Sequence, residues 1–314
     1  MPLSLRRGTV TAVLERHEGL VRLEVDGTAC VAYPRLTGPV ALGDEVVVNV
    51  QARELDLGSG GFDVLYANLT RGLDLDPEPD AHVMTLPYTP LQNAVRHVEE
   101  DGELAETLDG MPVVCCSVHS QVAPACAALG GLRVAYVQLA GGALPVSLSD
   151  AVRALRARGM LSLVAAAGPC VEADAQAVNV YSALAWASSR VDAIVCAVGP
   201  GIVGTGTNLG HGGVAAAEAA NAAAALGGRA VIAPRISGAD PRPRHRGVSH
   251  HTEAVLRLCL EPPLVPSEHE LDPPGWREAC EGLPLSHMGR GPDEDPKFFA
   301  AAFAAGRLAR SLVA

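Results

Sequence analysis

The stretch Ala193-Ile-Val-Cys-Ala-Val198, followed by Gly199-Pro-Gly-Ile-Val-Gly-Thr-Gly-Thr-Asn-Leu-Gly-His-Gly-Gly213, decides the fold. The first six residues are all apolar and do not alternate with polar ones, which is typical of a strand buried on both faces. An alanine-rich segment follows the glycines and predicts a helix over about 213–226. A buried strand, a loop and a covering helix form the repeating unit of a parallel α/β sheet.

The same unit recurs through the second half of the chain. Apolar runs predict strands at 112–118, 132–139, 161–166, 193–198 and 230–235, and the segments between and after them predict helices at about 121–129, 147–158, 174–189, 213–226 and 251–260. Strands that alternate with helices imply an α/β fold, which we expect to be a Rossmann-like parallel sheet with helices on both faces. Right-handed crossovers then bring every strand-to-helix loop to one edge of the sheet.

The N-terminal segment has a different pattern. Short strand-like runs occur at 8–14, 20–25, 28–33, 45–50 and 62–66, and Asp26-Gly27 is a strong hairpin signal. We therefore expect a small β-barrel domain of OB or SH3 type over 1–70. A connecting segment over 71–110, with a helical stretch after Gln92, leads to an α/β domain over 111–314. That domain contains an irregular proline-rich excursion at 261–292 and a C-terminal helix from Pro296 to about Leu312.

Composition excludes several classes of function. A net charge of -11 and only 4% aromatic residues disfavour a nucleic-acid partner. No apolar run is long enough to span a membrane and the N-terminus does not read as a signal peptide, so we expect a cytoplasmic protein. The eight cysteines form no C-x-x-C pair, which indicates buried reduced thiols. The single lysine, Lys297, leaves no candidate for a phosphate-loop lysine or a Schiff base.

Polar residues lie where the first predicted strand of the large domain ends. His119 and Ser120 follow this strand directly and precede a predicted helix. His119 is a candidate for proton transfer because histidine titrates near neutral pH. Ser120 is either a helix cap, which we favour, or a nucleophile, which would need a base and an orienting acid that the sequence does not reveal.

The loop after the fourth strand of the large domain contains seven glycines in fifteen residues. Such a segment offers open backbone amides at a helix N-terminus, so it predicts an anion cradle. Its candidate residues are Gly199, Gly201, Gly204, Thr205, Gly206, Thr207 and Asn208. The spacing Gly199-x-Gly201-x-x-Gly204 also satisfies a dinucleotide fingerprint, and Arg235 at the end of the next strand would suit the 2′-phosphate of NADP. We regard this pattern alone as weak evidence for NADP.

The loop after the fifth strand is rich in arginine and histidine although the protein is acidic. A connection this long is usually functional, and arginine favours phosphate or carboxylate. Its candidate anion contacts are Arg235, Ser237, Asp240, Arg242, Arg244, Arg246 and Ser249, with Arg290 from a later Gly-Arg-Gly turn. His245, His250 and His251 are proton-transfer candidates, and together with Asp240 they could instead hold a divalent metal ion. The plain alternative is a salt-bridged surface loop.

Several of these segments resemble one known family. The segments are Gly199-Pro-Gly-Ile-Val-Gly-Thr-Gly-Thr207, Asp240-Pro-Arg-Pro-Arg-His-Arg-Gly-Val-Ser-His-His-Thr252, Met288-Gly-Arg-Gly291, His119-Ser120 and Tyr88-Thr-Pro-Leu-Gln92. Together they resemble the bacterial family DUF3866, whose function is unknown. The resemblance spans nearly the whole chain and implies no particular reaction.

We therefore expect an enzyme that acts on a small anionic metabolite, either phosphorylated or nucleotide-like. Three alternatives stay open: a non-catalytic metabolite sensor or assembly protein, an NADP-linked oxidoreductase, and a metal-dependent hydrolase. The position of the histidines separates the first alternative from an enzyme, since histidines turned to bulk solvent favour sensing. The N-terminal barrel and the alanine-rich helices are compatible with a homodimer.

Overall fold

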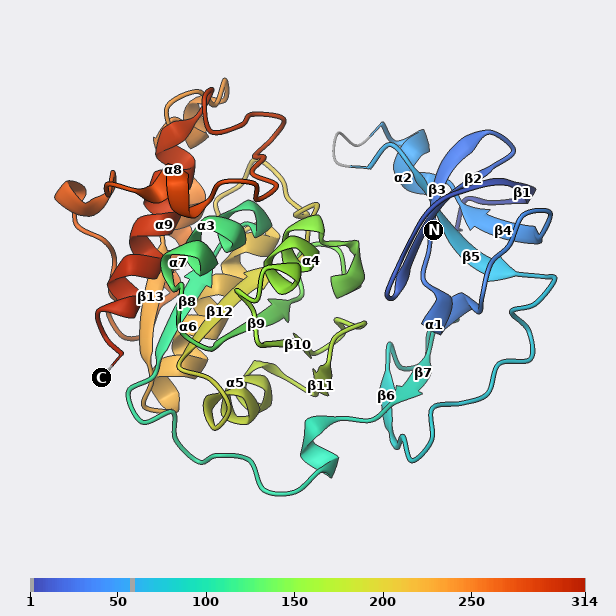
Figure 1. Cartoon of the computed structure of the whole chain (residues 1–314), viewed down its shortest axis with the longest axis horizontal. Coiled ribbons are helices and arrows are strands. Elements are labelled where there is room, and N and C mark those ends of the chain that lie inside the picture. Colours follow the sequence, from blue (N-terminus) through green and yellow to red (C-terminus); the bar gives the residue numbers. More distant parts are fainter. Residues whose placement is uncertain (1–2, 57–59, 314) are drawn as a thin grey trace. The chain divides into compact units, whose positions relative to one another are not determined.

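The computed structural model of the chain describes residues 3–56 and 60–313 (Figure 1). The chain divides into two units, Met1–Arg96 and His97–Ala314.

The first unit is built on a closed barrel of five strands, as predicted. The strands are β1 (Leu5–His17), β2 (Leu20–Val25), β3 (Thr28–Ala32), β4 (Glu45–Asn49) and β5 (Asp63–Asn68), with two short helices, α1 (Pro34–Thr37) and α2 (Gln51–Glu54). Their order around the barrel is β1-β2-β3-β5-β4, and β3 pairs with β5 in parallel. Alternate apolar side chains fill the interior, Leu23, Val46 and Leu65 among them.

The segment after the barrel departs from the prediction. It holds a hairpin of β6 (Val83–Thr85) and β7 (Asn93–Val95), followed by the 3-10 turn η1 (Val98–Glu100). The helical stretch predicted after Gln92 is therefore wrong. Asn93, Ala94 and Val95 instead pair with Thr85, Met84 and Val83, so pairing with the preceding strand of a hairpin overrides the local helical pattern.

The second unit contains a parallel sheet of six strands, also as predicted. The strands are β8 (Pro112–Cys116), β9 (Val134–Leu139), β10 (Leu163–Ala167), β11 (Ala175–Ala177), β12 (Ala193–Val198) and β13 (Arg229–Ala233). Their order is β11-β10-β9-β12-β8-β13, so β12 lies between β9 and β8. Strand β11 lies within the helix predicted over about 174–189, and this prediction is wrong for its first residues, because Ala175–Ala177 pair with β10 and the helix begins only at Val180.

Helices cover both faces of this sheet (Figure 1). One face packs against α3 (Val122–Ala128), α4 (Asp150–Ala157), α8 (Trp276–Ala279) and α9 (Pro296–Arg310). The other packs against α5 (Val180–Ser188), α6 (Ala215–Ala225) and α7 (His250–Leu258). The 3-10 turns η2 (His119–Gln121), η3 (Val146–Leu148), η4 (Gly212–Val214), η5 (Pro243–His245) and η6 (Glu268–Glu270) lie in the connections, as does the hairpin of β14 (Ile236–Ser237) and β15 (Gly247–Val248).

Two further expectations from the sequence can be compared with the structure. All eight cysteines are unpaired and all but Cys259 are buried, which agrees with the prediction of reduced thiols. Across the described residues, no helix has the length and apolar character needed to cross a membrane.

Candidate functional site

The loops after β8, β12 and β13 meet at the carboxyl edge of the sheet. This follows from the strand order, because β8 pairs with both β12 and β13 and all three strands run parallel. Ligand sites of open α/β sheets are found at this edge. The sequence placed its candidate residues on these loops, and the structure brings two of the loops into direct contact: the ring of His211 stacks on that of His251 with centroids 3.7 Å apart.

The arginine-histidine loop, which we define as residues 235–249, is closed rather than extended. Its two ends pair as the hairpin of β14 and β15, and Arg235 O accepts a hydrogen bond from Ser249 N at 2.9 Å. Ser249 then caps α7, because its Oγ accepts a hydrogen bond from His251 N. Ser249, a candidate anion contact in the sequence, therefore serves here as the cap that starts the helix at His250.

Four buried histidines form one contiguous group, which we call the histidine cluster: His211, His245, His250 and His251. The ring of His250 lies 4.6 Å from that of His251 and 4.8 Å from that of His245, measured between centroids. On an extended segment, the neighbouring side chains of His250 and His251 would point to opposite sides. They are instead the first two residues of a helix, and their rings meet.

A buried arginine connects this cluster to a second group of polar residues. Arg235 is 2% exposed, and its Nη1 donates to His251 Nδ1 at 3.1 Å. Its Nη2 donates to His287 Nε2 at 3.2 Å. Burial, followed by the positive charge of Arg242, lowers the pKa of Arg235 to about 10, so its guanidinium stays charged at neutral pH.

Asp240 is the buried counter-charge of three arginines. It accepts two hydrogen bonds from the guanidinium of Arg242, at 2.9 and 2.8 Å, one from Arg242 N at 3.0 Å and one from Arg290 at 3.2 Å, and it lies 3.6 Å from Arg235. Burial would raise the pKa of this carboxyl, but the hydrogen bonds from Arg242 outweigh burial and hold the pKa far below its usual range. Its oxygens are engaged with guanidinium groups, so Asp240 organises the loop rather than offering a free ligand.

Ser237 belongs to the same framework. Its hydroxyl donates to Asp295 and accepts from Asp240 N at 2.9 Å. Asp295 also accepts a hydrogen bond from Gly238 N at 2.9 Å and forms an ion pair with Arg290 at 3.5 Å. These contacts tie the arginine-histidine loop to the start of α9.

Ser120 contacts a histidine that the sequence did not single out. Its Oγ lies 2.9 Å from His287 Nδ1, while the other nitrogen of His287 accepts from Arg235. Because arginine is always a donor, Nδ1 of the neutral ring carries the proton and donates it to Ser120. His287 therefore does not face Ser120 as a base. The capping role favoured for Ser120 is wrong, since neither η2 nor α3 has a side-chain cap.

His119 lies in a separate set of contacts. Its Nδ1 is 3.1 Å from Val198 O and its Nε2 is 2.6 Å from Ser149 Oγ, which caps α4. The carbonyl fixes the proton on Nδ1, so Nε2 accepts from the serine. Burial lowers the pKa of His119 to about 4. Its nearest ring among the described residues is that of Tyr136, at 6.0 Å, and not one of the histidine cluster.

The glycine loop, residues 199–213, uses several of its glycines for backbone packing. A Cβ on Gly199 would lie 2.0 Å from Ala143 O, and one on Gly212 would lie 2.0 Å from Gly141 O. The loops after β9 and β12 therefore touch backbone to backbone, as only glycine allows. Gly201 adopts a φ of 70°.

The tip of the glycine loop satisfies its own polar groups. Thr205 Oγ1 lies 2.9 Å from Thr207 Oγ1 and donates to Gly210 O, and Gly210 N donates to Thr207 Oγ1 at 3.0 Å. Gly204 bridges to His211 across this turn. Asn208 contributes its carbonyl, which lies 3.1 Å from His211 Nε2. The tip is exposed. The hydrogen bond to Asn208 O and the bridge to Gly204 hold His211 in place.

The histidines of the cluster are neutral at physiological pH. Burial, followed by the charge of Arg235, lowers the pKa of His251 to about 2 and that of His245 to about 3. Burial is also the main cause of the lowered pKa of His211, and burial followed by Arg244 lowers that of His250. Each ring therefore has one nitrogen with a lone pair and one with a proton.

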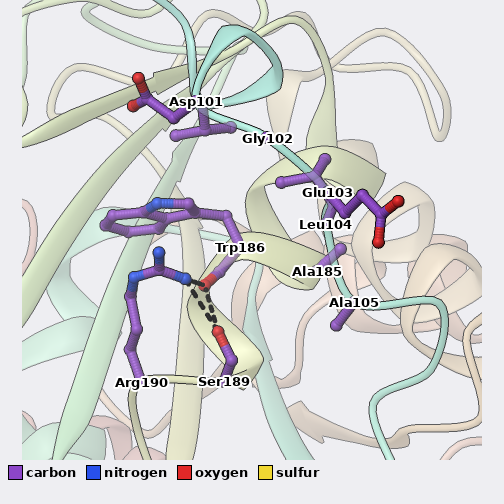
Figure 2. Close-up of a pocket in the computed structure, with 10 residues that line it drawn as sticks. Asp101, Gly102, Glu103, Leu104, Ala105, Ala185, Trp186, Ser189 and Arg190 are labelled. Atoms are coloured by element: carbon purple, nitrogen blue, oxygen red, sulfur yellow. Dashed lines mark hydrogen bonds between the residues drawn. The ribbon is translucent and has the colours of Figure 1, made fainter.

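One pocket lies away from this site, on the amino side of the sheet. It is lined by residues that precede β8 and β12, including Leu104, Trp186 and Arg190. Figure 2 shows the Arg190 guanidinium beside the ring of Trp186, 4.8 Å from its centroid, with hydrogen bonds to Trp186 O and Ser189 Oγ. Arg190 therefore already contacts residues of its own helix end. The pocket lies at the amino edge of the sheet, whereas ligands of such sheets bind at the carboxyl edge.

Sequence reasoning missed two residues of this site. His211 was quoted within the glycine loop but not selected, although it directly precedes a predicted helix start. His287 lies 52 residues beyond Arg235 and is seated by stacking on Phe298, with ring centroids 3.8 Å apart. A histidine next to the Gly-Arg-Gly turn was the available signal for His287.

Fold and site together define the class of this molecule: a two-unit α/β protein with a buried histidine and arginine site at the carboxyl edge of a parallel sheet. Comparison with known families gives a more specific result. The family described as "Protein of unknown function (DUF3866)" matches residues 29–274, and the chain belongs to this family. The match includes Arg235 and the whole histidine cluster and ends before His287. No curated protein matches the chain.

Proposed function

We propose that this protein is an enzyme that binds a small anionic metabolite, phosphorylated or nucleotide-like, beside the histidine cluster. The observation that carries the proposal is the charge of the arginine-histidine loop. Arg244 and Arg246 are exposed and form no ion pair with any described residue, in a chain of net charge -11. Arginine forks recognise phosphate and carboxylate groups.

The histidines are the groups that would transfer protons. Arg244 lies close enough to His250 to lower its pKa, so an anion held by Arg244 would lie near this ring. Both ring nitrogens of His250 are buried without a hydrogen-bond partner among the described residues. A neutral imidazole with an unused donor and an unused acceptor can both give and take a proton.

Two alternatives receive less support from the geometry. A non-catalytic sensor would turn its histidines to bulk solvent, whereas His245, His250 and His251 are buried. An NADP-linked oxidoreductase needs Arg235 near the ribose phosphate, but Arg235 is buried and both of its amino groups donate to histidines. The glycine loop, whose threonines bond to one another, is also less suited to wrapping a pyrophosphate.

We further propose that the barrel is of OB type and that the sheet is a variant of the Rossmann-like arrangement. Support for the first comes from β5, which lies between β3 and β4 and so breaks a simple meander. Support for the second comes from parallel strands with helices on both faces. The position of β12 between β9 and β8 distinguishes this sheet from the common dinucleotide-binding strand order.

The proposal is tested first by native mass spectrometry of the freshly purified chain, with identification of any compound released on denaturation. Binding of inorganic phosphate is then measured by calorimetry on the full chain and on the double variant Arg244→Gln/Arg246→Gln. Each lost charge-assisted contact should weaken binding about tenfold or more. Arg257→Gln, an exposed arginine of α7, is the matched control. Binding that is equal in the double variant and the control would refute the proposed site.

A further inference from the structure

Three residues of the histidine cluster stand out by the position of their nitrogens. His211, His250 and His251 each offer one nitrogen, and these atoms lie within 4.8 Å of one another. We propose that these three side chains form a binding site for a divalent transition metal ion of the zinc type. The inference rests on these nitrogens alone and does not depend on the proposed anionic substrate. With an ion bound, the lone pair of His250 is used for coordination, and His250 no longer accepts a proton.

His211 is oriented as a metal ligand would be. Its Nε2 lies 3.1 Å from Asn208 O and donates its proton there, which leaves the lone pair on Nδ1. This Nδ1 is buried and has no hydrogen-bond partner among the described residues. A backbone carbonyl that fixes the tautomer of a histidine is the usual outer support of a metal ligand. A bare lone pair attracts a cation and repels an anion, so an anion alone does not explain it.

His250 provides independent support for a metal site. It is 8% exposed and neither of its ring nitrogens has a partner among the described residues. An unsatisfied buried polar atom costs roughly 1 to 3 kcal/mol. The two unpartnered nitrogens of His250 lie beside the unpartnered Nδ1 of His211, which is unfavourable unless a bound species contacts them. A metal ion would accept one lone pair from His250 and one from His211.

His251 completes the set and has a competing partner. Its Nδ1 already carries a lone pair, because the permanent donor Arg235 faces it at 3.1 Å. A metal ion bound to this nitrogen replaces the hydrogen bond from Arg235. Arg235 then keeps His287 and Asp240 as partners. His245 and Asp240 are not in the set, because His245 Nδ1 contacts Ser249 and Asp240 is engaged by arginines.

The ligand set indicates the kind of metal and of site. Imidazole nitrogens suit zinc, copper, nickel and iron rather than magnesium or calcium. Three protein ligands leave one position open, which distinguishes catalytic zinc sites from structural ones. The positive charges of Arg235 and Arg244 and the N-terminus of α7 outweigh nearby Glu253, so this position favours an anionic ligand such as hydroxide.

The test is a titration of the chelator-treated full chain with Co²⁺, followed by visible absorption. Four-coordinate Co²⁺ absorbs strongly, and we expect one such ion per chain. His211→Ala and His250→Ala should each lower the affinity by about 100-fold or more, since even outer-shell changes cost about 10- to 100-fold. His269→Ala, which removes an exposed histidine of η6, should leave the affinity unchanged.

A second measurement does not depend on the folding of variants. X-ray absorption of the zinc-loaded full chain should show three imidazole ligands. The proposal is overturned if the wild-type chain binds no stoichiometric Co²⁺, if both variants bind as the control does, or if the zinc shell contains fewer than two imidazoles. Because phosphate is absent from these experiments and no arginine is changed, failure here is distinct from failure of the proposed anion site.

Discussion

The glycine loop and the arginine-histidine loop follow β12 and β13, which are consecutive in the sequence and separated by β8 in the sheet, and they differ in where they place their polar groups. The glycine loop looks like a ligand cradle in the sequence, yet its glycines at 199 and 212 serve backbone packing and its threonines bond to one another. The arginine-histidine loop looks like a charged surface, yet Arg235, Asp240 and His245 are buried. Composition alone does not show which loop buries its polar side chains, because burial depends on the elements that pack around each loop.

The largest effect should come from removing the guanidinium at the centre of the arginine-histidine loop. Arg235→Met leaves Asp240 without one of its counter-charges and His251 and His287 without their donor. Loss of one partner of a buried ionic network costs about 3 to 5 kcal/mol. The free energy of unfolding is measured in urea by tryptophan fluorescence, since Trp186 and Trp276 both belong to the second unit.

The matched control is Arg244→Met, which changes an exposed arginine of the same loop and should alter stability by less than about 0.5 kcal/mol. If the two variants were equally stable, the arginine-histidine loop would be a surface loop after all, and the contrast with the glycine loop would disappear.

A smaller loss is expected within the glycine loop. Gly199→Ala places a Cβ 2.0 Å from Ala143 O, so the two backbones must move apart, at a cost of about 2 to 3 kcal/mol. Gly206→Ala, at the tip, meets nothing within 4 Å and should be neutral. The same urea measurement checks both. Equal stability of the two variants would contradict the packing role of Gly199.

Stability should also depend on pH. Burial lowers the pKa of His287 to about 3 and that of His119 to about 4, whereas an unfolded histidine titrates near 6.5. Below about pH 6.5 the unfolded chain binds more protons than the folded chain, so stability falls as pH falls from 6.5 toward 4. The urea midpoint should therefore decrease between pH 7 and pH 5.

The variant His287→Gln keeps a polar group next to Ser120 and Arg235 but cannot titrate in this range. Its urea midpoint should decrease less steeply with falling pH than that of the wild-type chain. A wild-type midpoint that is flat from pH 7 to pH 5 would contradict the neutral, buried state of these histidines.

The strands of both units could be predicted because their signals are local. Runs such as Ala193–Val198 contain no polar residue, and Asp26-Gly27 marks a hairpin by itself. The order of the strands was not predictable, since nothing in β12 (Ala193–Val198) specifies that it lies between β9 and β8. The segment around β7 (Asn93–Val95) failed for the same reason, because its partner strand decides its conformation.

The site was predicted as a set of loops but not as a set of contacts. His250 and His251 were found because they share a conspicuous segment with several arginines. His211 and His287 were not, because their roles depend on a stacked ring and on a partner 52 residues away. Tautomers and unpartnered nitrogens, which separate a cation site from an anion site, are properties of the folded chain alone.

The contact of Arg235 with His287 has a consequence for the order in which the protein matures. His287 is seated by Phe298 of α9, and α9 packs so closely on α3 that a Cβ on Gly306 would lie 2.2 Å from Ala125 O. During synthesis the chain emerges from its N-terminus, so the barrel and most of the sheet exist before α9 does. Until α9 docks, Arg235 lacks one of its two histidine partners. The hydrogen bonds around Arg235 are therefore complete only after α9 has formed and packed against α3.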